Sequence, residues 1–227
     1  WLGLSMAVAL SASAMGCKDN NVSLFIRQVQ VPDPDDGCRV TNDPTADGLR
    51  SGFMDLALTS NYFQNLLIGN QLIPRGDADQ LKPESSRVQL YEMEVSVFDF
   101  QSTELAKFTV PVSGFTDESQ GTSPSYGLVE GQLIDPVTSS KISTAGGGQT
   151  VVARIKVFGT TLGGTEVETG FWDFPIFVCG GPGVSCTQAY LPDSCTDDAI
   201  KLPCLPGQDT EHDCRLLPGA KGPNCCP

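Results

Sequence analysis

Thiols are the side chains in this sequence whose number and spacing carry the clearest chemistry. The chain contains nine cysteines in 227 residues. Cys17 follows a short apolar stretch and Cys38 lies alone. The other seven are Cys179, Cys186, Cys195, Cys204, Cys214, Cys225 and Cys226. So many cysteines are typical of exported proteins, because thiols pair as disulfides in an oxidising compartment.

The sequence offers two fates for Cys17. The residues AMGC at 14–17 resemble the lipobox of bacterial lipoproteins, which implies cleavage before Cys17 and acylation of its thiol. Ala14 stands where that motif usually has Leu. The alternative is cleavage by the general signal peptidase after ASA at 12–14. Parity favours acylation, because the other eight cysteines can then close four disulfides, whereas nine cysteines leave one thiol unpaired.

The stretch before Cys17 has the character of an export signal. Residues 1–16 carry no charge and are small or apolar, and they are too few for a spanning helix of roughly 20 residues. The sequence begins at Trp1 without a basic region, so we expect the start of the leader to be missing. Several acyl chains, each methylene contributing about 0.8 kcal/mol, would anchor residues 17–22 as a tether in the membrane. Lys18 in place of Asp implies, by the same resemblance, the outer membrane.

Counting also predicts a bond between distant parts of the chain. Seven cysteines in 179–227 cannot all pair with one another. Cys38 is the only other cysteine left if Cys17 carries lipid. We therefore expect Cys38 to link the start of the protein to this C-terminal segment, with a partner that the sequence does not identify.

Few other side chains suggest catalysis or metal binding. His212 is the only histidine, so a Ser-His or Cys-His scheme has no other base. A zinc site with Cys214 lacks the C-x₂-C spacing, and a solvated loop is the favoured interpretation of His212. Five carboxylates lie close together in the sequence and would be the ligands of a calcium loop: Asp33, Asp35, Asp36, Asp43 and Asp47. Their spacing departs from the EF-hand pattern, which favours a polar loop instead.

Two further groups have a structural and a functional interpretation. Glu92 and Glu94 would lie about 6–7 Å apart on one strand face, within the range of a glycosidase pair, but a solvated strand looks the same. Trp172 and Phe174 would form a ligand platform if exposed, although packing in the core is the more usual role of such aromatics. We predict no enzyme activity, no cofactor and no metal site.

Alternation with a period of two dominates residues 23–178 and predicts strands. We expect strands over 23–31, 53–58, 63–72, 88–97, 108–112, 150–158 and 166–178, with a strand or a short helix over 127–135. Val88 and Leu90 are out of phase with Met93, which predicts a bulge near Leu90. Pro111 predicts an edge strand, and TTLGG predicts a hairpin turn. The expected fold is an all-β, two-sheet immunoglobulin-like sandwich, with a barrel as the alternative.

After residue 178 the composition changes. Residues 179–227 are rich in Cys, Pro and Gly and contain one aromatic residue, Tyr190, so disulfides rather than a core must hold this tail. The chain as a whole is 40% hydrophobic and has a formal charge of −13. This composition suits a folded body and excludes nucleic acid as a partner.

The chain resembles a group of uncharacterised outer-membrane lipoproteins of myxobacteria and related bacteria. The resemblance rests on the lipobox-like cysteine, LLIGNQLIPRGD at 66–77, RIKVFGTTLGGTEVE at 154–168 and LPCLPGQDTEHDC at 202–214. It implies a lipid-anchored envelope protein that faces the periplasm or the cell surface and carries no assigned activity. We therefore expect a non-enzymatic binding or structural module. The alternatives are an accessory domain for a glycan or peptide partner and a calcium-stabilised adhesin-like domain.

Overall fold

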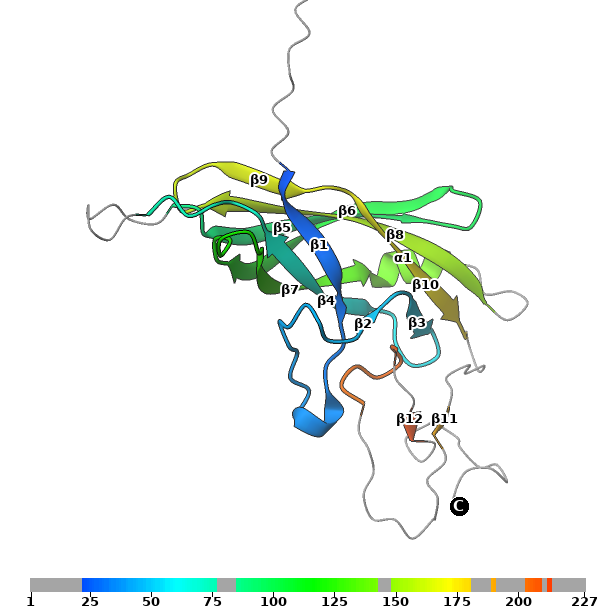
Figure 1. Ribbon diagram of the computed structural model, residues 1–227. Helices are drawn as coiled ribbons and strands as arrows, with labels where there is room; N and C mark the ends of the chain where they lie inside the picture. Colours follow the sequence, from blue (N-terminus) through cyan, green and yellow to red (C-terminus); the bar gives the residue numbers. More distant parts are fainter. Residues whose placement is uncertain are drawn as a thin grey trace, which may run out of the picture.

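The computed structural model describes residues 22–76, 85–142, 148–180, 189–190, 203–209 and 212–213. Within them the protein is all-β, as the alternation predicts (Figure 1). The strands are β1 (Val22–Gln30), β2 (Gly48–Leu49), β3 (Gly52–Asp55), β4 (Tyr62–Asn70), β5 (Val88–Phe98), β6 (Glu104–Thr116), β7 (Ser125–Ile134), β8 (Gln149–Thr161), β9 (Glu166–Thr169), β10 (Trp172–Cys179), β11 (Ala189–Tyr190) and β12 (His212–Asp213). The expected signal peptide, Cys17 and most of the C-terminal tail lie outside the described residues.

Ten of these strands form one mixed sheet. Ladder pairs give the order β3-β10-β8-β9-β1-β4-β7, with β5 beside β8, β6 beside β5, and β2 beside β1. Most neighbours are antiparallel, but β1 runs parallel to β9 and β3 runs parallel to β10. Strands β11 and β12 form a separate parallel pair. The pairing thus joins these strands in one sheet, whereas the sequence predicted two.

The bulge predicted near Leu90 is present. The register of β5 shifts between Leu90 and Glu92 against both β6 and β8. Tyr91 is the extra residue and is exposed, whereas Leu90 and Met93 are both buried. The bulge therefore turns the Tyr91 side chain outward, away from the buried Met93.

The hairpin around TTLGG is also confirmed, with one difference. Strand β8 pairs antiparallel with β10 over residues 149–155 and with β9 over residues 158–160. The single strand expected over 166–178 is interrupted at Gly170 and Phe171. The interruption lets β9 lie against β1 while β10 lies against β3.

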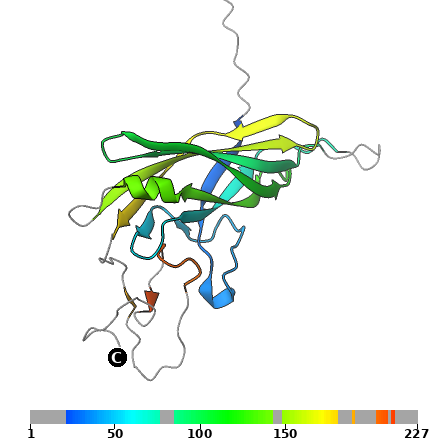
Figure 2. The ribbon, with the colours of Figure 1, turned by 180° about the vertical axis from the view of Figure 1, so that it is seen from behind.

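The structure settles one alternative that the sequence left open and adds a helix. Residues 127–134 belong to the strand β7, and after the cap residue Asp135 a helix follows as α1 (Pro136–Lys141) (Figure 2). The Asp135 carboxylate caps this helix by accepting from the Thr138 N–H, and Pro136 occupies its first turn. Pro111 lies in β6, which within the described residues pairs with β5 alone, so the edge position is confirmed.

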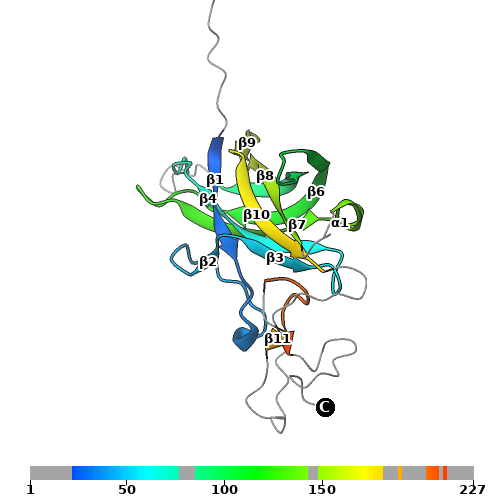
Figure 3. The same ribbon diagram turned by 90° about the vertical axis from the view of Figure 1, so that its right-hand side faces the viewer.

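The sheet curls until its two ends, β6 and β7, come into contact (Figure 3). Glycines permit this approach: a Cβ on Gly127 would meet the carbonyl oxygen of Phe115, and a Cβ on Gly114 would meet that of Leu128. The two halves of the curled sheet enclose one core, in which the largest buried side chains are Tyr62, Phe174, Leu24, Met54, Leu66, Leu67, Ile68, Leu90, Met93, Leu133, Ile134 and Ile155.

Candidate functional site

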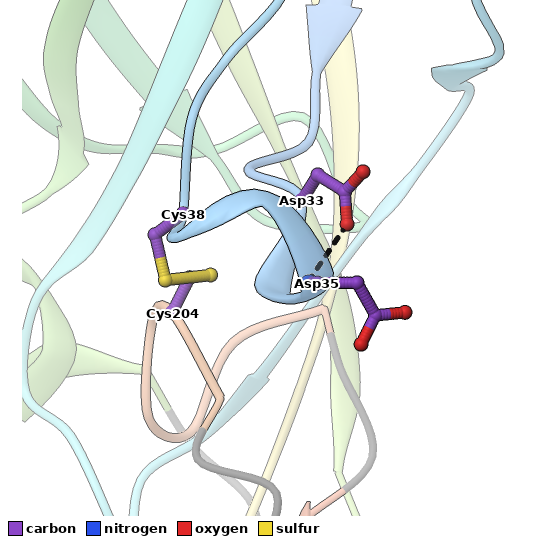
Figure 4. Close-up of a disulfide and its surroundings, with 4 residues drawn as sticks. All are labelled: Asp33, Asp35, Cys38 and Cys204. Atoms are coloured by element: carbon purple, nitrogen blue, oxygen red, sulfur yellow. Dashed lines mark hydrogen bonds between the residues drawn. A yellow bond between two sulfur atoms is a disulfide. The ribbon is translucent and has the colours of Figure 1, made fainter.

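A disulfide joins the first loop of the body to the C-terminal tail. Cys38 bonds Cys204 across 166 positions of sequence, with 5.4 Å between their Cα atoms (Figure 4). This is the link that the cysteine count predicts, and the structure identifies the partner. Cys179 is disulfide-bonded as well. The pairing of Cys186, Cys195, Cys214, Cys225 and Cys226 stays a prediction, because these residues lie outside the described ones.

The loop between β1 and β2 uses its carboxylates for local structure. The Asp33 carboxylate caps the 3-10 helix η1 (Pro34–Asp36) by accepting from the Asp35 N–H at 2.9 Å (Figure 4). The Asp43 carboxylate accepts from the N–H and the hydroxyl of Thr45, and these bonds lower the pKa of Asp43. Among the described residues no three His, Cys, Asp or Glu side chains gather as metal ligands. The described carboxylates of Asp33 and Asp43 thus make local hydrogen bonds within this loop.

The structure contradicts the prediction that Trp172 and Phe174 form an exposed aromatic platform. Phe174 points into the core and is fully buried, and Trp172 stacks on it with ring centroids 5.4 Å apart. Alternation along β10 places both side chains on the inner face. Phe171, at the break between β9 and β10, is the more exposed of the accessible aromatic residues here, with 62% of its surface accessible.

The outer face of β8 carries cations and aromatic rings side by side. The Lys156 ammonium lies 5.2 Å from the ring centroid of Phe171 and 5.4 Å from that of Phe158. The Arg154 guanidinium lies 5.3 Å from the ring centroid of Phe98. Contacts of this kind contribute about 0.5–1 kcal/mol at exposed sites and present flat, polarised surfaces to solvent. We call these five residues the aromatic–cation face.

The remaining candidates have structural roles where they are described. The Glu94 carboxylate pairs with the Lys107 ammonium at 3.1 Å, and Glu92 lies opposite Phe158 and Pro111 on the outer side of β5. The main chain of His212 pairs with that of Ala189, and its side chain lies outside the described set.

A buried polar cluster that the sequence analysis did not identify lies where residues 203–209 meet the body. This segment, orange at the bottom of Figure 1, follows the edge of β3 that faces away from β10. The Asp55 N–H donates to the Gly207 carbonyl at 2.9 Å, and the Asp209 N–H donates to the Phe53 carbonyl at 3.0 Å. Met54 and Gln208 form an antiparallel bridge between these two bonds. The tail thus meets the sheet through a single bridge at Gln208, between Gly207 and Asp209, which both have a positive φ.

The Asp209 carboxylate is the centre of the cluster. It accepts from the Phe53 N–H at 2.6 Å, from the Tyr62 hydroxyl at 2.9 Å, and from the Gln64 amide. The Gln64 amide also donates to the Tyr62 oxygen at 2.7 Å. Tyr62 and Gln64 are buried and stand on the same inner face of β4. The cluster therefore presents three neutral donors to one carboxylate.

Burial governs the ionisation of this cluster. The pKa of Asp209 is raised above its ordinary value, chiefly because burial penalises the charge, while the hydrogen bonds from Phe53, Tyr62 and Gln64 lower it in part. The pKa of Tyr62 is raised well above its ordinary value by burial and by the negative charge of Asp209. Tyr62 thus remains protonated and acts as a donor rather than as a nucleophile.

One signal in the sequence pointed to this cluster. Along β4, Tyr62, Gln64, Leu66 and Ile68 alternate onto the inner face. A glutamine amide among apolar neighbours needs a hydrogen-bonding partner when it is buried. Its partner lies 145 positions away, in a tail without strand periodicity, so only the tertiary structure identifies Asp209.

A cleft of ≈ 580 Å³ lies between the loop after β1 and the ends of β6 and β7. Among its charged lining side chains, Asp36 pairs with Arg39 at 3.5 Å, Asp117 pairs with Arg87 beside the cleft at 3.0 Å, and Asp33 caps η1. The lining thus holds three carboxylates, Asp33, Asp36 and Asp117, and one guanidinium, Arg39.

No helix among the described residues is long and apolar enough to cross a membrane. Comparison with known proteins adds no relative: no family model, no curated protein and no solved structure matches this chain.

Proposed function

We propose that the protein is an exported, lipid-anchored cell-envelope lipoprotein that acts as a non-enzymatic binding or structural module. The observation that carries this proposal is the Cys38–Cys204 disulfide. Disulfides persist in exported proteins and are rare where cytosolic reductants act. With Cys38 paired to the tail, the parity of the remaining cysteines supports acylation of Cys17.

The position of β1 suits a membrane tether. Strand β1 begins at Val22, five positions after Cys17, and its nine residues span about 30 Å. Its start and the docked segment 203–209 lie at opposite ends of the body (Figure 1). An anchor at Cys17 would therefore hold the start of β1 toward the outer membrane and turn the docked segment away from it. The immunoglobulin-like classification is part of this proposal, since the two halves of the curled sheet face one another across one core.

Intact-mass analysis of protein from bacterial membranes, expressed from its own gene, tests the anchor. We expect a chain that begins at Cys17, carries acyl groups and gains eight protons on reduction of four disulfides. Cys17→Ser should release the protein from the membrane fraction. An unmodified Cys17, or cleavage after Ala14, would overturn the proposal.

The aromatic–cation face favours a second candidate function, an accessory module for envelope glycans or peptides. An exposed ring beside an ammonium group can stack on a sugar or a peptide side chain, and Phe171 is the most accessible aromatic in this face. Cosedimentation with isolated peptidoglycan tests this role. We expect Phe171→Ala to weaken binding at least tenfold. Phe177→Ala is the matched control, because this ring lies in the adjoining strand β10, is 42% accessible and contacts Phe53 instead of a cation. Equal binding by both variants would remove this candidate.

A further inference from the structure

One end of the body gathers three segments of the chain: the start of β1, the segment after β4, and the turn between β8 and β9 (Figure 1). A small pocket of ≈ 270 Å³ lies among them. Residues from all three segments line it, among them Ser23, Leu72, Arg75, Thr161 and Gly163. We call residues 22–24, 70–75 and 161–165 the anchor end, because β1 begins there.

Two large apolar side chains are exposed at the anchor end. Ile73 is 65% accessible and Leu162 is 58% accessible. Ile73 follows Leu72, and Leu162 stands between Thr161 and Gly163, so both positions lie beside the same pocket. Single exposed apolar residues are ordinary on a protein surface, but two at the end from which the chain leaves for its anchor form a small apolar contact surface.

Hydrogen bonds fix the main chain at both positions. The Leu162 N–H donates to the Arg87 carbonyl at 2.9 Å. On the other segment, the Leu72 N–H donates to the Asn70 side-chain oxygen at 2.9 Å, and the Leu72 carbonyl accepts from the Ser119 N–H at 2.8 Å. Because the sheet holds the main chain beside both apolar side chains, the fold itself keeps them exposed.

The length of chain before β1 indicates which surface covers them. Strand β1 begins at Val22, five positions after Cys17, and five residues reach at most about 17 Å. Acyl chains on Cys17 would lie in the bilayer, so the anchor end would stay within that distance of the lipid. The opposite end of the body lies farther away, because β4 extends about 30 Å from Asn70 back to Tyr62.

Attraction between charges does not supply this contact. The chain has a formal charge of −13, which repels anionic headgroups. Apolar side chains gain free energy on leaving water whatever the charge of the headgroups, and interfacial segments bury their apolar side chains about 5–10 Å deep at the boundary of headgroups and acyl chains. A lipid surface is therefore a partner of the right chemistry for Ile73 and Leu162.

We propose that Ile73 and Leu162 insert into the bilayer in which Cys17 is anchored, so that the anchor end lies against the lipid surface. This inference rests on the proposed acylation of Cys17. A single flexible tether leaves the body free to rotate, whereas three points of attachment define a plane. The two apolar side chains thus fix the orientation of the body on the membrane.

Tryptophan quenching by brominated lipids tests the insertion. Acylated protein from bacterial membranes is reconstituted in phosphatidylcholine vesicles whose acyl chains carry bromine, which quenches tryptophans that reach the hydrocarbon. Trp172→Phe removes the one tryptophan that remains after cleavage before Cys17. In this background a single tryptophan is introduced by Ile73→Trp, Leu162→Trp or Val137→Trp.

Val137 is the matched control. It is 62% accessible and lies in α1, which follows β7 where Ile134 pairs with Tyr62, at the end of β4 away from Asn70. Bromine should quench roughly half of the emission at positions 73 and 162 and leave the emission at position 137 nearly unchanged. Equal quenching at the three positions would overturn the proposal.

A charge placed at one position tests whether the two side chains act together. Leu162→Asp in the Ile73→Trp protein should remove most of the quenching, because a carboxylate resists transfer into hydrocarbon. Val137→Asp in the same protein should leave the quenching unchanged. Quenching at position 73 that is indifferent to Leu162→Asp would contradict joint insertion.

Flotation with the same vesicles separates a failure of insertion from a failure of the anchor. Protein that floats but is quenched equally at the three positions refutes the insertion and leaves the lipoprotein proposal intact. Protein that carries no acyl chain and does not float refutes both. Blue-shifted emission at positions 73 and 162 in the Cys17→Ser protein without vesicles, growing with protein concentration, would show that a second copy covers the anchor end and would also refute the insertion.

Discussion

Replacing Asp209 with Ala removes the acceptor shared by three donors at the end of the curled sheet. The Phe53 N–H, the Tyr62 hydroxyl and the Gln64 amide lose this partner together, although Gln64 keeps its bond to the Tyr62 oxygen. A buried donor left without an acceptor costs about 1–3 kcal/mol. Asp209 is partly accessible, so water can satisfy part of the loss. We expect Asp209→Ala to lower the free energy of unfolding by about 2–4 kcal/mol.

Equilibrium urea unfolding with all disulfides intact measures this loss. The matched control is Asp173→Ala, because Asp173 also accepts two hydrogen bonds, from the Arg154 guanidinium, but does so on the exposed face of β10. Surface ion pairs of this kind contribute little to stability, so the control should unfold close to the wild type. A loss below about 0.5 kcal/mol for Asp209→Ala, or an equal loss in both variants, would refute the view that the cluster holds the tail on the body.

Three further predictions concern the same fold. The pKa of Asp209 in the folded state is raised above its ordinary value of 3.8, so its contribution to stability should be complete below pH 3.8 and decline as the pH rises through the raised pKa. Asp209→Asn should abolish this decline in urea titrations from pH 3 to 7. Cys38→Ser with Cys204→Ser should cost about 2–5 kcal/mol in the same assay, and an unchanged denaturation midpoint would count against a bond that restrains the unfolded chain. Gly127→Ala should cost about 1–3 kcal/mol in thermal unfolding because of the collision with Phe115, whereas Gly170→Ala, with open space around it, should leave the melting temperature nearly unchanged.

Local pattern in the sequence determined most of the strands of this protein. Alternating side chains place apolar residues on one face of an extended chain, so the phase change at Leu90 was enough to reveal a bulge before the structure did. Counting thiols was enough to join Cys38 to the tail, since pairing in an oxidising compartment restricts which cysteines remain free.

Only the tertiary structure decided which strands meet and what the tail does. The parallel pairs β1–β9 and β3–β10, the contact of β6 with β7, and the burial of Phe174 depend on positions far apart in sequence, to which local alternation is blind. The same holds for Asp209, whose carboxylate joins Tyr62 and Gln64 across 147 and 145 positions. The sequence shows that a buried glutamine needs a partner, but the closure of the chain in space selects which residue supplies it.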